Sequence, residues 1–179
     1  NELRSGNFNL SILREYQGIA DTPVVPYYAQ FDRIFPGSKF ILTIREMSSW
    51  LVSVQKHWET ASTHQHDPAK RAFQEFIRTA VYGCVEFNHD RFQYVYETHV
   101  QNVINYFADR PSDLLVLDIC AGEGWEKLTQ FLNLPVPPEP FPHANEWMHK
   151  LIQASEEIKI SIPQGDSFSL IDDQALGGN

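Results

Sequence analysis

Apolar residues in the middle of the chain form one short continuous run and then change to a helical period. Residues 40–44 read Phe-Ile-Leu-Thr-Ile, and Arg45 follows at once. After Arg45 the apolar positions recur every three or four residues, at Met47, Trp50, Leu51, Val54 and Trp58. An apolar strand without alternation is typical of a parallel sheet that is covered on both faces. The pattern therefore predicts a strand, an arginine at its carboxyl end and a helix.

The same reading predicts further elements on both sides of this unit. The segments with helical spacing, in chain order, are 10–16, 22–35, 69–87, 90–108, 123–132 and 146–157. Two more strands are expected, at residues 18–21 with Asp21 at the end and at residues 114–117 with Asp118 at the end. The polar residues 60–68 and the proline-rich run 134–142 read as loops.

This order of elements predicts the α/β class, with a mostly parallel sheet between layers of helices. The chain of 179 residues is long enough for one domain with a sizeable core, and it contains no visible internal repeat. We expect that domain to span residues 1–150. Residues 151–179 are expected to form a C-terminal helix and a linker, or the start of a further domain.

Composition narrows the possible partners. A net charge of −9 argues against a nucleic-acid groove, which needs a basic face. One or two placed arginines can still bind a small anionic ligand in an acidic protein. The two cysteines, Cys84 and Cys120, are too few for a disulfide framework, which favours a reducing compartment. Because no apolar run approaches the ~20 residues of a membrane span, we expect a cytoplasmic protein.

Arg45 and Ser53 are the first candidates for a binding site. They lie eight residues apart, one at the end of the predicted strand and the other about two turns into the helix. The carboxyl ends of parallel strands are where open α/β sheets bind ligands. A guanidinium fork and a hydroxyl at this spacing can bind different oxygens of one phosphate. The ordinary alternative is that Arg45 pairs with a neighbouring carboxylate and that Ser53 is a surface residue.

Three blocks of sequence, in the right order, resemble the PAPS-dependent sulfotransferases of the P-loop-type branch. The first has Asp-x-Pro at Asp21, the second is the strand–Arg–helix–Ser unit of residues 35–53, and the third covers residues 114–145. The third block contains Gly-Glu-Gly-Trp at 122–125 and Pro-Phe-Pro-His-x-Asn at 140–145. The resemblance covers residues 18–145. It implies a P-loop-type three-layer sandwich and transfer of a sulfuryl group from PAPS to a hydroxyl or an amine.

The resemblance implies roles where residues match. Arg45 and Ser53 would bind the 3′-phosphate of the nucleotide. Asp21 would be the catalytic base that takes the acceptor's proton. The alternative for Asp21 is a cap on the helix that begins at Pro23.

Four further residues are possible site-lining residues. Tyr27 and Tyr28 could stack on the acceptor or the adenine, although aromatic residues at helical spacing usually belong to a core. His143 and Asn145 match the third block, and packing of their loop is an equally good interpretation.

One part of the family pattern has no counterpart in this sequence. The family has a glycine-rich loop whose backbone N–H groups bind the 5′-phosphosulfate. Residues 4–6, Arg-Ser-Gly, are similar to part of such a loop, but no strand precedes them, so we expect the chain to begin downstream of it. This leaves a second hypothesis, a truncated or non-catalytic domain that acts through protein contacts. The acceptor, whether a small molecule, carbohydrate or lipid, and the oligomeric state stay open.

Two other hypotheses are weaker. Asp118 with Gly122 and Gly124 resembles the first motif of methyltransferases that bind S-adenosylmethionine, but too little sheet-forming sequence follows it, and five prolines interrupt residues 135–142. A metal site is not expected. His64 and His66 alternate in a polar segment without a nearby cysteine, whereas zinc needs three or four well-placed ligands.

Overall fold

The computed structural model of the protein describes residues 2–63 and 67–142. Up to Glu139 these residues belong to one compact unit, and Pro140 begins a second unit. The helix expected at 146–157 and the domain boundary expected at 150 lie outside the described residues. So do four histidine and asparagine residues discussed above, His64, His66, His143 and Asn145.

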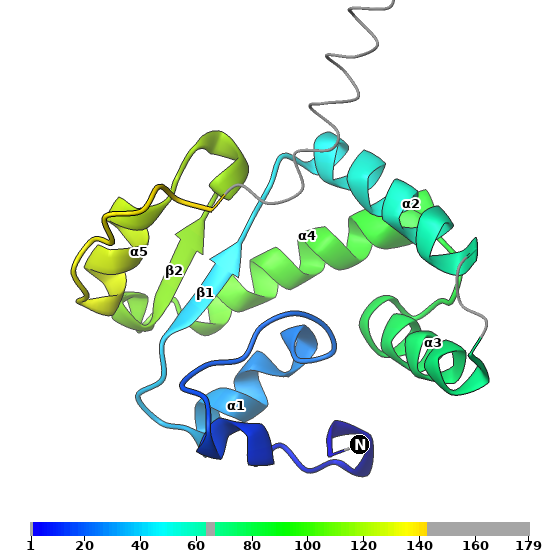
Figure 1. The fold of residues 1–179 in the computed structure, drawn as a ribbon, viewed down its shortest axis with the longest axis horizontal. Helices are drawn as coiled ribbons and strands as arrows, with labels where there is room; N and C mark the ends of the chain where they lie inside the picture. Colours follow the sequence, from blue (N-terminus) through cyan, green and yellow to red (C-terminus); the bar gives the residue numbers. More distant parts are fainter. Residues whose placement is uncertain (1, 64–66, 143–179) are drawn as a thin grey trace, which may run out of the picture. The chain divides into compact units, whose positions relative to one another are not determined.

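Two parallel strands form the sheet of the described region (Figure 1). Strand β1 (Phe40–Thr43) pairs with β2 (Leu114–Leu117), in a register that runs from Phe40 opposite Leu114 to Thr43 opposite Leu117. The pairing continues one step further, because the Ile44 N–H donates to the Leu117 carbonyl at 2.9 Å. The strands predicted at 40–44 and 114–117 are confirmed. Because they are parallel, Arg45 and Asp118 follow them at the same edge of the sheet.

Five α-helices accompany the sheet in the described region. They are α1 (Tyr28–Ile34), α2 (Met47–Thr63), α3 (Pro68–Tyr82), α4 (His89–Tyr106) and α5 (Trp125–Leu132). Short 3-10 turns occur at Leu3–Ser5, Ser11–Arg14, Val25–Tyr27, Pro111–Asp113 and Ile119–Ala121. The chain between β1 and β2 contains α2, α3 and α4, which makes the long crossover that a parallel pair requires.

Helix α4 belongs to two hydrophobic cores. Val103 in its C-terminal half and Phe107 at its C-cap pack with Leu42 of β1. Its N-terminal half contributes Phe92, which packs with Leu51 and Trp58 of α2. Burying one such side chain fully is worth about 1.5–3 kcal/mol. The helix therefore fixes α2 relative to the strand that precedes it, which is the unit that carries Arg45 and Ser53.

The ends of α4 and α3 follow capping rules. The Asn88 side chain accepts a hydrogen bond from the Arg91 N–H and starts α4, and the Asp67 side chain accepts from the Ala69 N–H and starts α3. Helix α3 ends at Gly83, whose φ of 72° is left-handed and suits a residue without a Cβ. Helix α3 is therefore shorter than the predicted 69–87, whereas α4 agrees with the predicted 90–108.

The strand predicted at residues 18–21 is wrong. These residues are irregular, and Asp21 has a φ of 73° in a turn. The Asp21 carboxylate accepts a hydrogen bond from the Thr22 N–H at 2.6 Å, so the side chain closes a local turn instead of continuing an extended segment. Four residues with no pairing partner in the described region do not make a strand.

Three predicted helix boundaries also need correction. The helix expected from residue 22 is a 3-10 turn at Val25–Tyr27 followed by α1, because Pro26 lacks an N–H and restricts the residue before it. The loop expected at 60–68 is partly helical, since α2 continues to Thr63. Helix α5 begins at Trp125, two residues later than predicted, after Gly124.

The three-layer sandwich stays a prediction, because the sheet in the described region has two strands. The exposure of β1 is consistent with a sheet that is incompletely covered here. Leu42 is buried against α4, whereas Ile41, on the opposite face, is 43% exposed. The mixed α/β class and the parallel pairing are what the structure supports.

Candidate functional site

Arg45 lies directly between β1 and α2, and its backbone is held by one side chain of α4. The Arg45 N–H donates to the Tyr96 hydroxyl oxygen at 2.8 Å, and the same hydroxyl donates to the Arg45 carbonyl at 2.7 Å. The Tyr96 ring packs on the ring of Trp50 in α2, with centroids 4.6 Å apart. Tyr96 therefore fixes the bend through which the chain passes from strand to helix.

The Arg45 guanidinium binds a hydroxyl and not a carboxylate. Its Nε and Nη2 atoms both donate to the Ser49 Oγ, at 2.9 and 2.6 Å. Within residues 2–63 and 67–142, no carboxylate oxygen forms an ion pair with it. Both side chains are half-buried. The alternative in which Arg45 pairs with a neighbouring carboxylate is therefore not what the described residues show.

Ser49 and Ser53 are four residues apart and so lie one above the other on one face of α2. Arg45 precedes the helix by two residues, and its side chain is bound to Ser49 on that face. A rise of about 1.5 Å per residue separates Ser49 and Ser53 by roughly 6 Å along the axis. Ser53 is half-buried, and its hydroxyl forms no hydrogen bond with any other residue of the described part.

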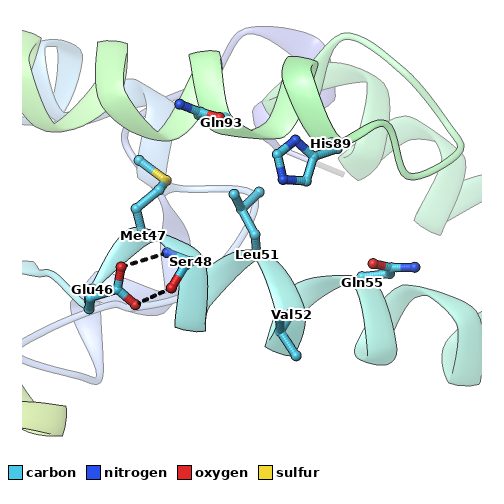
Figure 2. Close-up of a pocket in the computed structure, with 8 residues that line it drawn as sticks. All are labelled: Glu46, Met47, Ser48, Leu51, Val52, Gln55, His89 and Gln93. Atoms are coloured by element: carbon cyan, nitrogen blue, oxygen red, sulfur yellow. Dashed lines mark hydrogen bonds between the residues drawn. The ribbon is translucent and has the colours of Figure 1, made fainter.

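The first amides of α2 already have an anionic partner. The Glu46 carboxylate accepts hydrogen bonds from the Ser48 N–H at 2.8 Å and from the Ser48 hydroxyl (Figure 2). It also accepts one from the Ser49 N–H at 2.7 Å. The Ser48 hydroxyl and these amides lower the pKa of Glu46, and the nearby charge of Arg45 adds to the effect. A second anion at this end of the helix would be repelled, so the Arg45–Ser49–Ser53 face is the better place for one.

An open hollow of about 380 Å³ lies beside α2, but on another face (Figure 2). Its lining comes from the first turns of α2 and α4 and consists of Glu46, Met47, Ser48, Leu51, Val52, Gln55, His89 and Gln93. At 3.6 residues per turn these α2 positions are roughly a third of the helix circumference away from Ser49 and Ser53. The hollow has no lysine or arginine, so it does not suit a phosphate.

Asp21 is exposed and lies in the turn before the Val25–Tyr27 segment. Its carboxylate bonds the Thr22 N–H, and no side-chain cap is made on that turn or on α1, so the capping alternative is not observed. Burial raises the pKa of Tyr82, and the negative charge of Asp21 adds to that rise, which places Asp21 near the end of α3. No contact in the described region joins Asp21 to Arg45 or Ser53.

Tyr27 and Tyr28 have packing partners in the structure. The Tyr27 ring lies 5.0 Å from the ring of Phe8. Tyr28 packs edge-on against Tyr106 and His99, at 5.4 and 5.8 Å, next to the sheet core. Burial raises the pKa of Tyr28 and lowers that of His99. A role of either tyrosine in lining the site stays a prediction.

The segment after β2 forms a closed turn at the same edge of the sheet. The Asp118 carboxylate accepts from the Ala121 N–H at 2.9 Å, and the Asp118 N–H donates to the Glu123 carboxylate at 2.8 Å. Gly122 has a φ of 91°, which a residue with a Cβ rarely adopts. The acidic side chains are thus used within the turn.

Arg4 belongs to the short segment that is similar to part of a phosphate loop. It lies in a 3-10 turn, and its guanidinium carbon is 5.3 Å from the centroid of the Phe76 ring.

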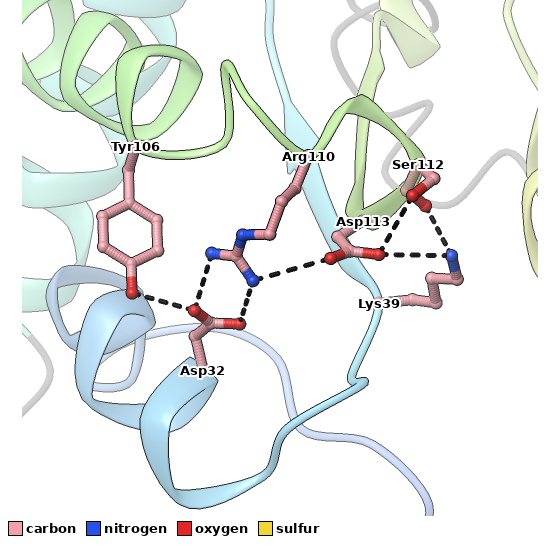
Figure 3. A network of polar contacts seen from close by, with 6 residues as sticks. All are labelled: Asp32, Lys39, Tyr106, Arg110, Ser112 and Asp113. Atoms are coloured by element: carbon pink, nitrogen blue, oxygen red, sulfur yellow. Dashed lines mark hydrogen bonds and ion pairs between the residues drawn. The ribbon is translucent and has the colours of Figure 1, made fainter.

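A second arginine shows what a structural ion pair looks like in this protein (Figure 3). Arg110 binds both carboxylate oxygens of the buried Asp32, at 3.0 and 2.8 Å, and the Tyr106 hydroxyl donates to the same carboxylate at 2.8 Å. Arg110 and Tyr106 lower the pKa of Asp32. Asp113 and Lys39 extend this network to the starts of β2 and β1. The network ties α1 to α4 and the sheet.

Ser49 and Tyr96 are the residues of this region that the sequence reasoning missed. Ser49 could have been found, because it lies four residues from both Arg45 and Ser53 and so shares their helix face. Tyr96 had no comparable signal. It is one of the apolar positions that define α4, and its contact with Arg45 spans 51 residues of sequence.

Comparison with known proteins identifies the family. Residues 5–149 match the model of the sulfotransferase domain, so the chain belongs to the sulfotransferase family, whose members are transferases. Ava biosynthesis cluster protein M of Aspergillus versicolor is 27% identical over 149 residues, which are 74% of this chain and 55% of that protein. The chain thus spans about half the length of this relative.

Family membership also decides an alternative left open by the sequence. The match includes residues 118–124, so the glycine motif that resembles a methyltransferase belongs to a sulfotransferase domain. No helix of the described region has the length and apolar character needed to cross a bilayer.

Proposed function

We propose that this protein transfers a sulfuryl group from PAPS to a hydroxyl, or to an amine, of an acceptor. Arg45 and Ser53 bind the 3′-phosphate of the nucleotide, and Asp21 is the base. The observation that carries the proposal is the Arg45 guanidinium, which follows β1 at the ligand-binding edge of a parallel sheet and has only a neutral partner among the described residues.

The residues present fit a phosphate. Only two of the five guanidinium N–H groups of Arg45 are used, so three donors are left for an anion. The serine hydroxyls along α2 add neutral donors, and hydrogen bonds from such groups to phosphate oxygens are charge-assisted. A single arginine suffices to hold a small anion in a protein with a net charge of −9, because the interaction is local.

When bound, PAPS supplies the sulfuryl group, and 3′,5′-ADP is the other product. Arg45 orients the nucleotide through its 3′-phosphate. Asp21 would accept the proton of the acceptor hydroxyl while the hydroxyl oxygen forms a bond to sulfur and the bond between sulfur and the 5′-phosphate oxygen breaks, which leaves the electron pair on that phosphate. The Asp21 carboxylate is exposed and has one strong hydrogen bond, to the Thr22 N–H, so its second oxygen is accessible for this task.

The proposal is tested by measuring sulfate transfer by the full-length protein from PAPS to a panel of phenols, sugars, lipids and amines. We expect turnover with one acceptor class. Arg45→Ala should raise the KM for PAPS, and Asp21→Asn should lower kcat about 10²-fold or more without weakening nucleotide binding. Ser48→Ala is the control, because the Ser48 hydroxyl is bonded to Glu46 on a different face of α2.

Two outcomes would contradict the proposal. Binding of 3′,5′-ADP without turnover on any acceptor would support the non-catalytic alternative. An Asp21→Asn variant with unchanged kcat would remove Asp21 as the base and leave the nucleotide site intact.

A further inference from the structure

We infer that Ser49 is a third ligand of the 3′-phosphate and that it also positions Arg45. This inference rests on the proposed function, since it adds a residue to the same nucleotide site. The anion would be held by three donors, Arg45 just before α2 and Ser49 and Ser53 on one face of the helix.

The hydrogen bonds of Ser49 leave its own proton available. The Ser49 Oγ accepts from both the Nε and the Nη2 of Arg45, so both of its lone pairs are used. No residue of the described region accepts the Ser49 hydroxyl hydrogen. The usual acceptor for a serine within a helix is the carbonyl four residues earlier, which here is Arg45, and that carbonyl already accepts from Tyr96.

Charge makes this proton a good donor. A hydroxyl that accepts two hydrogen bonds from a guanidinium is polarised, and such bonds strengthen one another. The Arg45 Nη2 atom that donates to Ser49 has a second N–H, so an anion bound there would share this nitrogen with the Ser49 hydroxyl. One oxygen of that anion can take the Arg45 donor and another the Ser49 proton.

Position along the chain fits the same role. Ser49 lies midway in sequence between Arg45 and Ser53, about 6 Å along the helix axis from Ser53. A phosphate whose oxygens are bound by Arg45 and by Ser53 would therefore pass Ser49. Ser49 fills that interval, and it also keeps the long Arg45 side chain against α2.

The neighbouring Ser48 shows that this is a property of one face and not of the sequence Ser48-Ser49 as such. The Ser48 hydroxyl donates to Glu46 at 2.7 Å, so its proton is used. Ser48 lines the apolar hollow on the other face (Figure 2). Ser48→Ala is therefore a matched control.

The test compares two nucleotides that differ only in the 3′-phosphate. Calorimetric titration with 3′,5′-ADP and with 5′-AMP gives a selectivity ratio for each variant. We expect Ser49→Ala to weaken 3′,5′-ADP binding by about 5–10-fold and to leave 5′-AMP binding unchanged. Ser49→Thr, which keeps a hydroxyl, should restore the wild-type ratio to within about twofold. Ser48→Ala should not change it. Melting temperatures without nucleotide check that each variant is folded.

The possible outcomes distinguish a failure of the inference about Ser49 from a failure of the proposed nucleotide site. If Ser49→Ala binds 3′,5′-ADP as well as or better than wild type while Arg45→Ala loses the selectivity, the inference about Ser49 is overturned and the proposed nucleotide site survives. Equal affinities of the wild-type protein for 3′,5′-ADP and 5′-AMP would overturn both. A loss of affinity for both nucleotides to the same degree would show that Ser49 acts on the fold and not on the phosphate.

Discussion

Two arginines near α4, Arg45 beside Tyr96 in the middle of the helix and Arg110 just after its C-terminal end, have opposite surroundings. Arg110 binds the two oxygens of the buried carboxylate of Asp32, and the Tyr106 hydroxyl donates a further hydrogen bond to that carboxylate (Figure 3). Arg45 binds one serine hydroxyl, and its backbone is held by Tyr96. Each arginine region thus has one tyrosine of α4, ten residues apart, but only Arg110 has an anionic partner among the described residues.

The difference is the one expected between a structural arginine and an arginine that binds a ligand, which is the role proposed for Arg45. A carboxylate neutralises Arg110 in the absence of any ligand, so the pair stabilises the junction of α1, α4 and the sheet. Arg45 is oriented by neutral groups that do not cancel its charge, and an incoming anion meets no competing carboxylate on the guanidinium. We therefore expect changes at the Arg110 region to alter stability and changes at the Arg45 region to alter nucleotide binding.

The largest effect on stability is expected at the Arg110 region. Asp32→Ala removes the carboxylate on which Arg110 and Tyr106 converge and should lower the free energy of unfolding by about 2 kcal/mol; the partial exposure of Arg110, 42%, keeps the loss below that of a fully buried pair. Urea unfolding measures it. The affinity of the folded fraction for 3′,5′-ADP should equal that of wild type, and a parallel loss of affinity would erase the distinction between the regions.

A change at the Arg45 region should instead weaken nucleotide binding and leave stability nearly unchanged. Arg45→Lys keeps the positive charge but loses the planar fork, and it should weaken 3′,5′-ADP binding about tenfold, which corresponds to about 1.4 kcal/mol. The free energy of unfolding should change by no more than about 0.5 kcal/mol, because no buried carboxylate depends on Arg45. Calorimetric titration and urea unfolding on the same sample separate the two quantities. A lysine variant with full affinity would show that charge alone suffices.

The two tyrosines of α4 provide a matched pair of variants. Tyr96→Phe and Tyr106→Phe each remove one hydroxyl and should each cost about 1 kcal/mol of stability. Only Tyr96→Phe should also weaken 3′,5′-ADP binding, about threefold, since it releases the backbone of Arg45. Equal affinities in both variants would mean that the Tyr96 contact does not position Arg45.

The smallest expected effect concerns pH. Burial lowers the pKa of His99, which lies on α4 between the two tyrosines. The unfolded state therefore binds a proton at higher pH than the folded state, and the free energy of unfolding should fall as pH drops below about 6.5. His99→Gln should flatten this slope without changing nucleotide selectivity. A slope that persists in the variant would assign the effect to other groups.

The Asp32 network should lose stability at a lower pH than the step caused by His99. Because Arg110 and Tyr106 lower the pKa of Asp32, its contribution to stability is present above about pH 4 and is lost as pH falls through the lowered folded-state value. The His99 and Asp32 steps are thus separated along the pH axis and can be measured in one series of urea titrations.

The sequence predicted the elements whose pattern is local. Strands β1 and β2 are short apolar runs bounded by turn residues and charged residues, and α4 has a clear helical period between Asn88 and residue 107. The strand predicted at 18–21 is wrong because an apolar pair beside a glycine does not supply a strand to pair with. Pro26 delayed the start of α1, and a polar composition at 60–63 did not stop α2, because helix propagation needs no apolar face.

The candidate site was predictable in part for the same reason. Arg45 and Ser53 stand at positions defined by the strand–helix unit, so sequence spacing finds them. The same spacing could have identified Ser49, but a single serine in a sequence is not a distinctive signal of a binding site. The Tyr96 contact and the Asp32–Arg110 pair depend on how α4 packs across the sheet, with partners 51 and 78 residues apart, and local patterns do not encode such distances.

The central claim is that Arg45 binds the 3′-phosphate of the nucleotide, and the thermal shift caused by 3′,5′-ADP tests it most directly. At a hundredfold excess over its Kd the nucleotide should stabilise the wild-type protein by about 2.7 kcal/mol, a rise in Tm of roughly 5–10 °C. In Arg45→Ala, with an unchanged Tm in the absence of nucleotide, the same concentration should produce almost no rise. An equal shift in both proteins, or no shift in the wild type, would contradict the account.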